Sequence, residues 1–215
     1  MERTISGVGT IDKALSVLDA TERRPLTLAE LVEVTGITRA TTHRLASALE
    51  THGLLRRLDG GRFAPGLRLL ALGRAAAAAL PMAELAGLAL VALRDATGES
   101  VQLYVRQGAE RVCVASLESP HGLRTIVEAG EALPVDRGSA GRVLLGQSGE
   151  DGWLASVEER EPGVASVSAP VLDPSGATIA AVGVSGPVER LTRNPGARHG
   201  RRVVDAAREI EAAAR

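Results

Sequence analysis

Aromatic residues are nearly absent from this 215-residue sequence, which contains one tryptophan, one tyrosine and one phenylalanine. Proteins that bind single-stranded nucleic acid without sequence preference stack the bases on several aromatic side chains. The composition excludes such a platform. For nucleic-acid binding, it favours a helix that inserts into the groove of a duplex.

Cysteine and long apolar segments are also scarce. The single cysteine, Cys113, excludes an internal disulfide and a cysteine-rich metal site, and it fits a reducing compartment. The amino-terminal residues are polar and lack the apolar core of a signal peptide, and the alanine-rich run at 75–80 is too short to span a bilayer. We therefore expect a cytoplasmic protein that makes no membrane contact.

Few residues are arranged for catalysis or for metal binding. None of the four histidines has a metal ligand three or four residues further on, so each is expected to be structural or solvated. Cys113 lies in an alternating segment and is expected to be a small core residue, and the charged run at 158–161 is expected to be a solvated or ion-paired loop. We expect no catalytic residue, metal or cofactor, and an enzyme is only a minor alternative. The histidines are His43, His52, His121 and His199.

The charge is unevenly distributed along the chain. The net charge of −1 combines +3 in residues 1–74, which hold 11 Lys and Arg against 8 Asp and Glu, with −4 in the remainder. Residues 38–74 alone hold seven arginines and two acids. Because neutralisation of phosphates supplies most non-specific affinity for DNA, this segment has the charge that a DNA-binding module needs.

A helix-turn-helix is predicted between residues 27 and 53. Thr27 and Glu30 form a capping box that opens one helix, Gly36 ends it in a tight turn, and Thr38 caps the next helix. A preceding helix is expected to begin at Thr10. Its predicted apolar face, at helical spacing, consists of Ile11, Ala14, Leu15 and Leu18.

Helical spacing divides the second helix of this motif into two faces. Thr42, Leu45, Ala46 and Leu49 are expected to point inward. Ala40, His43, Arg44 and Ser47 then point outward, with Arg39 in the first turn. These outward residues are small or hydrogen-bonding, as a surface that reads a DNA groove requires.

A β-hairpin is predicted directly after this helix. Strands at 54–58 and 62–64 flank the turn residues Asp59-Gly60-Gly61. A hairpin in this position is a wing. Its arginines, Arg56, Arg57 and Arg62, are placed to contact phosphates or an adjacent minor groove.

A leucine- and alanine-rich helix at 67–81 is predicted to link two domains, residues 1–66 and 82–215. Pro81 interrupts the helical pattern, which resumes over 82–95 and stops at Thr97-Gly98. A helix of this composition is poorly soluble alone, so we expect it to pack against a partner subunit. A simple intramolecular core helix is the alternative.

The carboxy-terminal segment predicts an α+β domain with an antiparallel sheet. Residues 101–105 and 112–114 alternate as a hairpin, 123–127 is a further candidate strand, and 164–172 pairs with 177–184 across a turn. Gly138 opens a short helix that ends near Leu145, and residues 201–214 form a terminal helix. The small residues at 138–141 allow backbone amides to approach an anion, with a plain turn as the alternative. They lack the ending of a phosphate-binding loop.

Several blocks in fixed order resemble the IclR family of bacterial transcription regulators. They are GVGTIDKALSVLDA, TLAELVEVTGITRATTHRLASALETHGLL, TGESVQLYVRQG, RGSAGRVLL and EEREPGVASVSAPVLDPSGATIAAVGVSGPVERLT, followed by the terminal helix. The resemblance covers nearly the whole chain. It implies an amino-terminal winged helix-turn-helix, a linker helix that mediates dimer contact, and a carboxy-terminal GAF-like domain that binds a small effector.

The resemblance also implies two sets of site residues. The DNA-binding set on the recognition helix is Thr38, Arg39, Thr41, Thr42 and Arg44, with arginines suited to guanine. In members that bind small carboxylates, the effector set corresponds to Ser139, Ala140, Gly141, Ser156, Val164, Ser166, Gly183 and Ser185.

This sequence departs from the family pattern in two places. Family members carry some tens of additional residues where only 146–156 stand here, and that segment walls part of the pocket. Related sensors carry an acid, a thiol and a hydroxyl at the positions of Ser156, Ser166 and Gly183. The pocket is therefore expected to be open, weak or tuned to another ligand. The first and third blocks look most like members that control amino-acid synthesis, leucine in particular.

We therefore interpret the chain as a DNA-binding regulator, a homodimer or dimer of dimers, that acts on a roughly palindromic double-stranded operator. It is expected to be a repressor, with an activator as the alternative. Its expected effector is a small carboxylate or an amino acid. The alternative is a constitutive DNA-binding regulator whose sensor domain has lost its ligand.

Overall fold

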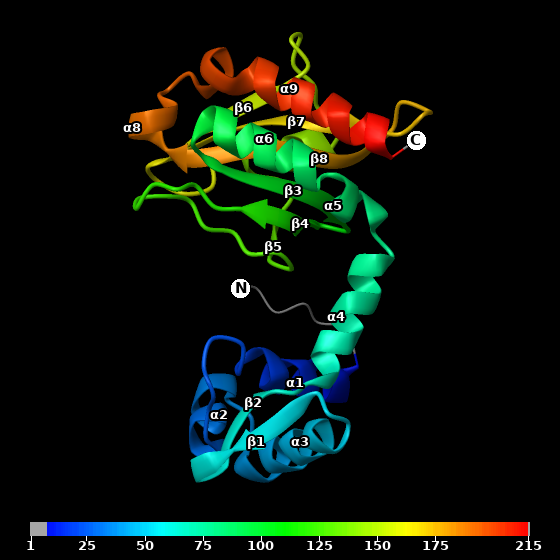
Figure 1. Ribbon diagram of the computed structural model, residues 1–215. Helices are drawn as coiled ribbons and strands as arrows, with labels where there is room; N and C mark the ends of the chain where they lie inside the picture. Colours follow the sequence, from blue (N-terminus) through cyan, green and yellow to red (C-terminus); the bar gives the residue numbers. More distant parts are fainter. Residues whose placement is uncertain (1–7, 215) are drawn as a thin grey trace. The chain divides into compact units, whose positions relative to one another are not determined.

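The computed structural model describes residues 8–214, which divide into two compact units, one ending at Ala79 and one beginning at Leu80. The fold is α+β, as the sequence predicts (Figure 1). Among the described helices, none is long and apolar enough to cross a membrane.

The first unit is a three-helix motif followed by a hairpin and a further helix. Its elements in chain order are α1 (Gly9–Asp19), α2 (Leu28–Thr35), α3 (Arg39–Thr51), β1 (Leu55–Leu58), a 3-10 turn η1 (Asp59–Gly61), β2 (Arg62–Pro65) and α4 (Arg68–Ala78). The strands β1 and β2 are antiparallel, which confirms the predicted wing hairpin. Leu26 adds a single bridge to Phe63, so the segment before α2 is tied to the hairpin.

The helix-turn-helix owes its geometry to short-range hydrogen bonds at α2. The Thr27 hydroxyl accepts a hydrogen bond from the Glu30 amide, and the Glu30 carboxylate accepts one from the Thr27 amide, so the predicted capping box is present. The Thr27 amide, with help from Arg24, lowers the pKa of Glu30 to about 2. Gly36 ends the helix in the left-handed conformation, with φ of 67°.

Two predicted helix starts need correction. Thr38 occupies the amino-terminal cap of α3, but its hydroxyl bonds the Thr41 hydroxyl at 3.1 Å and no backbone amide. Helix α1 begins at Gly9, before the predicted cap Thr10, and Val8 is its cap residue. A side-chain cap is therefore absent at both positions.

The core of the first unit forms where the three helices meet the hairpin. Its fully buried side chains include Val17, Leu31, Ala46, Leu55 and Phe63. The predicted apolar face of α1 is partly wrong, because the helix packs through Val17, and two residues of the predicted face remain about half exposed. These two residues are Ile11 and Leu15.

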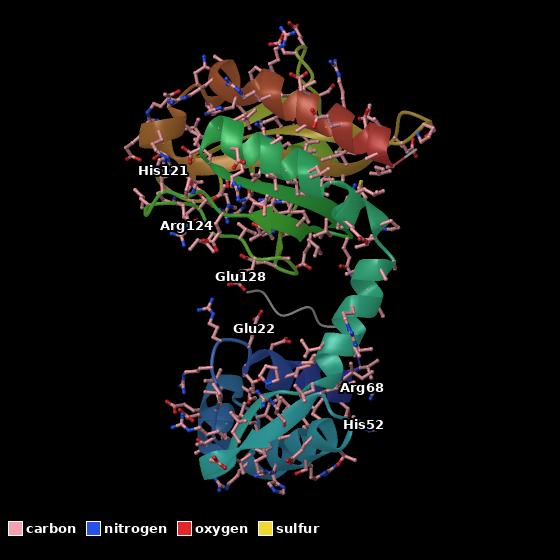
Figure 2. All side chains as sticks on the ribbon, viewed as in Figure 1. Glu22, His52, Arg68, His121, Arg124 and Glu128 are labelled. Carbon is pink, nitrogen blue, oxygen red and sulfur yellow. The ribbon has the colours of Figure 1, made fainter. Side chains whose placement is uncertain are left out.

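Helix α4 continues directly from the wing. Arg68 at its start donates a hydrogen bond from Nη1 to the His52 carbonyl oxygen at 3.0 Å, and Figure 2 shows the two side chains close together. None of the residues of α4 is buried. Within its own unit, α4 is therefore an exposed helix with exposed leucines.

The second unit is an antiparallel sheet with helices on its two faces. Its elements are α5 (Pro81–Leu85), α6 (Gly87–Thr97), β3 (Ser100–Gln107), β4 (Glu110–Leu117), β5 (Ala132–Pro134), α7 (Gly138–Leu144), β6 (Leu154–Val157), β7 (Val164–Leu172), β8 (Thr178–Pro187), α8 (Val188–Leu191) and α9 (Pro195–Ala213). The strand order is β5-β4-β3-β8-β7-β6, and each neighbouring pair is antiparallel.

Alternation along the strands separates two layers of side chains. On β7, Val167 and Val171 face the core that α6 and α9 cover (Figure 1). The intervening Ser168 faces the opposite side, where α7 packs. One face of the sheet is therefore a hydrophobic core, and the other is partly polar.

Residues 123–127 do not form the predicted strand. The Ser100 hydroxyl donates a hydrogen bond to the Thr125 carbonyl oxygen at 2.7 Å, and Arg124 donates one to the His121 carbonyl oxygen (both residues are labelled in Figure 2). Side-chain hydrogen bonds therefore hold this loop in place, and it pairs with no described strand. Sequence reasoning also missed β5, β6 and α8.

The terminal helix begins at Pro195, six residues before its predicted start at 201. Asn194 caps it by accepting a hydrogen bond from the Ala197 amide. Gly196 and Gly200 obscured this start, because glycine disfavours a helix interior. In the fold, both glycines face Trp153.

Candidate functional site

The first candidate site is the exposed face of α3. Arg39, His43 and Arg44 are exposed, and Thr41 is half-buried. Within residues 8–214, Arg39 and Arg44 form no ion pair or side-chain hydrogen bond, so both guanidinium groups are available to a partner. This face lies opposite the packed side of the helix, which buries Thr42, Ala46 and Leu49.

Thr42 does not belong to that exposed face. Its side chain is fully buried, and its hydroxyl donates to the carbonyl oxygens of Ile37 and Thr38, each at 3.1 Å. The inward position expected from helical spacing is correct. The assignment of Thr42 as a DNA contact is wrong for the side chain, because its hydroxyl fixes the first turn of α3.

The three wing arginines are exposed but differently engaged. Arg57 pairs with Glu50 at 3.1 Å and stacks over the Phe63 ring at 4.4 Å from the ring centroid. Arg56 donates to the Pro65 carbonyl at 3.2 Å. In the described part of the chain, Arg62 has no such partner, so it is the wing arginine most available to a phosphate.

The second candidate site is a cavity on the face of the sheet that α7 covers. Its volume is about 30 Å³ when only the space that admits a water-sized group is counted, and about 440 Å³ when all empty space, including the part open to solvent, is counted. Strands β3, β4, β6, β7 and β8 and the start of α7 surround it. The lining residues are Gln102, Tyr104, Arg111, Gly138, Ser139, Ala140, Ser156, Arg160, Val164, Ser166, Ser168, Gly183, Val184 and Ser185.

Seven of the eight residues expected to contact an effector line this cavity; Gly141 does not. A Cβ atom on Gly141 would stand 2.2 Å from the Val135 carbonyl oxygen and 2.6 Å from Arg111 Nη1. Gly141 therefore makes room for Arg111 behind the cavity wall.

A network of hydroxyl groups forms the floor of the cavity. The Ser139 hydroxyl lies 2.8 Å from the hydroxyls of both Ser166 and Ser168. Ser185 donates to the Gln102 side-chain oxygen at 3.0 Å. These groups can donate to or accept from a small polar ligand.

Sequence reasoning missed the polar residues that β3 and β4 contribute. Gln102, Tyr104 and Arg111 line the cavity and are 2%, 6% and 3% exposed. Strand alternation was the available signal, because Arg111 and Cys113 share a face. The sequence alone did not identify which face of the hairpin borders a cavity.

Burial is the largest cause of the pKa shifts of Tyr104, Arg111 and Cys113. Burial lowers the pKa of Arg111 and raises the pKa of the neighbouring Tyr104. Burial also raises the pKa of Cys113 to about 12, which keeps its thiol protonated and unreactive. No cluster of three or more His, Cys, Asp or Glu side chains within residues 8–214 is arranged to hold a metal ion.

Family models match both units. The model described as the IclR helix-turn-helix domain matches residues 10–59. The model described as the bacterial transcriptional regulator IclR C-terminal matches in two segments, 74–151 and 145–212. The two segments meet where the sequence is shortened relative to the expected family pattern.

Two curated relatives show the range of similarity. The HTH-type transcriptional regulator KipR of Bacillus subtilis is 32% identical over 137 residues, which cover 63% of this chain and 55% of that protein. The glycerol operon regulatory protein of Streptomyces griseus is 28% identical over 228 residues, covering 89% of this chain and 88% of that protein. That alignment is longer than this 215-residue chain, so the relative contains residues with no counterpart here.

Solved structures share the fold. An IclR homologue from Microbacterium hydrocarbonoxydans, crystallised with 4-hydroxybenzoate, matches with a TM-score of 0.79 at 19% sequence identity. The match covers 95% of this chain and 98% of that chain. At this identity, the similarity establishes a common fold.

Proposed function

Because the chain belongs to the IclR family of DNA-binding transcriptional regulators, we propose that α3 reads an operator while the cavity of the second unit binds a small effector. The observation that carries this proposal is the exposed α3 surface, where Arg39 and Arg44 have no side-chain hydrogen bond or ion pair with any described residue. Because the target of such a regulator is chromosomal DNA, we expect it in the cytoplasm.

On the DNA, Arg39 and Arg44 are proposed to reach base edges in the major groove, where arginine suits guanine O6 and N7. Thr38 and Thr41 are suited to phosphate contacts at the start of the helix. Arg62 is proposed to contact the backbone from the wing, with weaker contributions from Arg56 and Arg57, which already have protein partners. Thr42 supports α3 from the inside.

We propose a homodimer, or a dimer of dimers, on a roughly palindromic operator, because two copies of α3 then enter successive major grooves. The exposed leucines of α4 support this proposal. Leu70 and Leu72 are 67% and 49% exposed, and burial of such side chains against a second copy would stabilise the assembly. Repression follows if the bound dimer blocks a promoter.

The effector is proposed to be a small carboxylate or an amino acid. The cavity is small and most of its lining residues have polar or charged side chains, and a related structure was crystallised with 4-hydroxybenzoate, an aromatic carboxylate. Control of amino-acid synthesis, leucine in particular, rests on the GVGTIDKA and TGESVQLYVRQG blocks. The relatives named for a glycerol operon indicate the competing class of target.

Sequencing the genomic fragments that the purified protein retains, its own upstream region included, tests the DNA proposal. On the recovered operator, Arg44→Ala should weaken binding by about 1–3 kcal/mol per half-site and leave random DNA nearly unaffected. Arg62→Ala should weaken binding to both DNAs equally. Equal losses on operator and random DNA for Arg44→Ala would remove Arg44 from base recognition.

A constitutive regulator without an effector is the second candidate, and the shortened 146–156 segment favours it. Thermal unfolding against a panel of amino acids and small carboxylates separates the two candidates. A compound that binds the folded protein raises the unfolding midpoint. A panel in which no compound does so would favour the constitutive regulator.

A further inference from the structure

Arg111 is a buried cation without an acidic partner. Its side chain belongs to β4, is 3% exposed and lines the cavity. Within residues 8–214, no carboxylate lies within 4 Å of it; Asp136 acts only at longer range, and Glu159 pairs with Arg142 at 3.4 Å. An uncompensated buried charge is costly, so this cavity favours an anion.

The guanidinium of Arg111 is held through Nη1 and lies over the Tyr104 ring. Nη1 donates to the backbone carbonyls of Pro134, at 2.7 Å, and Arg137, while the Tyr104 ring lies 5.3 Å from the guanidinium carbon. Nε is buried and has no hydrogen-bond partner in the part of the chain that the structure describes. Nη2 lies beside Gly138, another lining residue. The edge formed by Nε and Nη2 matches the two oxygens of a carboxylate.

Gln102 provides a second unsatisfied donor in the same cavity. Its side-chain oxygen accepts from Ser185, but its Nε2 is buried with no hydrogen-bond partner among residues 8–214. The residue is 2% exposed. Buried amide groups are nearly always hydrogen-bonded, so the unpaired nitrogen is explained by an absent acceptor.

Arg160 adds a second positive charge to the lining. It lies on the turn between β6 and β7, where its Nη2 is 3.5 Å from the exposed Glu161 carboxylate. Arg160 is close enough to depress the pKa of Arg111 by charge repulsion. The lining holds two arginines and no acid, so a ligand with two negative charges complements it best.

We propose that the cavity binds a small dicarboxylate, with one carboxylate on the Nε and Nη2 edge of Arg111 beside the Gln102 amide, and the other on Arg160. This inference rests on the proposed function of the cavity as the effector site. It assigns recognition to β3, β4 and the β6–β7 turn, in addition to the serines of β6, β7 and β8.

The test is isothermal titration of the full-length protein with defined probes. The dicarboxylates are oxalate, malonate and succinate; acetate is the monocarboxylate, malonamide the neutral isostere and inorganic phosphate a non-planar anion. At least one dicarboxylate should bind about 10- to 100-fold more tightly than acetate, because a charged hydrogen-bonded pair is added. Equal binding of malonamide or acetate would overturn the proposal, and tighter binding of phosphate would overturn the carboxylate assignment.

Substitutions in the cavity test which side chains contact the dicarboxylate. Arg111→Lys retains the charge and removes the two-nitrogen edge, and Gln102→Glu retains the volume and the acceptor for Ser185 but replaces the free donor with an acid. Each should lower dicarboxylate affinity at least about tenfold. Arg160→Gln should lower dicarboxylate affinity and leave acetate unchanged. Arg208→Gln, at an exposed arginine of α9, is the control and should change neither.

A second measurement separates ligand contact from structural support. The Nε–H resonance of Arg111 in a nitrogen-15 spectrum, assigned by its loss in Arg111→Lys, should shift on addition of the dicarboxylate. An unshifted resonance, or variants that bind the dicarboxylate as the parent does, would overturn the proposal. If leucine instead binds and changes operator affinity, this inference fails and the proposed function stands. If no operator is bound, the proposed function fails independently.

Discussion

Trp153 is the single tryptophan of the chain, and it packs directly against two glycines of α9. A Cβ atom on Gly196 would stand 1.9 Å from Trp153 Cζ3, and one on Gly200 would stand 2.5 Å from its Nε1. Neither separation is possible without movement of the ring or of the helix. The two glycines therefore hold the segment before β6 against α9.

We expect Gly196→Ala to destabilise the second unit by about 1–3 kcal/mol, the usual cost of overpacking. Urea unfolding followed by Trp153 fluorescence measures the effect. Gly87→Ala is the matched control, because a Cβ at Gly87 meets no atom within 4 Å and alanine favours its helix. An unchanged midpoint for Gly196→Ala would show that the ring relocates at little cost.

His199 is a buried histidine whose protonation opposes folding. It is 4% exposed, and its Nδ1 has no hydrogen-bond partner among the described residues. Burial, followed by the charges of Arg198 and Arg202, lowers its pKa below the ordinary value of 6.5, and Glu99 partly offsets this. Below pH 6.5, the unfolded chain therefore binds a proton that the folded protein resists.

The stability of the second unit should consequently fall as the pH is lowered through 6.5 towards the depressed pKa of His199. His199→Gln should flatten this part of the profile. Thermal unfolding followed by Trp153 fluorescence between about pH 5 and 8 measures both proteins. His121→Gln, at an exposed histidine of the same unit, controls for the substitution. Parallel profiles for His199→Gln and the parent would contradict the prediction.

Individual helices and strands differ in how clearly the sequence predicts them. The capping box at Thr27 and the left-handed Gly36 predicted α2 and its end, because both act within a few residues. The four-residue strand β6 offers too little alternation to detect. Arg111 could not be assigned to the cavity, since its neighbours depend on the pairing of β4 with β3 and β5 and on Gly141, 30 positions further along the sequence.

Thr27 and Thr38 occupy equivalent positions before α2 and α3 but make different hydrogen bonds. We expect Thr27→Ala to cost about 1 kcal/mol, because it removes a backbone cap, and Thr38→Ala to cost less. Hydrogen exchange of the amides in residues 28–35 and 39–51 measures the local effect of each. Equal acceleration of exchange by the two substitutions would show that the capping bond contributes little.

Helix α4 presents exposed leucines, which supports dimer formation through this helix. Leu70→Glu should shift the protein towards a monomer and weaken operator binding, because a charge would be buried at the interface. Light scattering after size-exclusion chromatography measures the molar mass. Leu123→Glu, at a leucine that is 70% exposed against 67% for Leu70, is the matched control. An unchanged mass for Leu70→Glu would place the interface elsewhere.

For the whole molecule, the charge distribution assigns different partners to the two units. The basic segment at 38–74 favours DNA, while the remainder of the chain carries a net negative charge and holds two arginines in a small cavity. A ligand in that cavity changes operator affinity only if it binds the DNA-competent and DNA-incompetent states with different affinities.

Binding linkage therefore makes a quantitative prediction for the intact protein. A cavity ligand that changes operator affinity by some factor, typically about 5- to 150-fold, must have its own affinity changed by operator DNA by the same factor. Titration of the ligand with and without operator, and of operator with and without ligand, measures the two factors. Arg111→Lys should retain operator binding while losing the ligand-dependent change. A ligand that binds equally well in the presence and absence of operator would contradict this prediction, because it would occupy the cavity without acting as an effector.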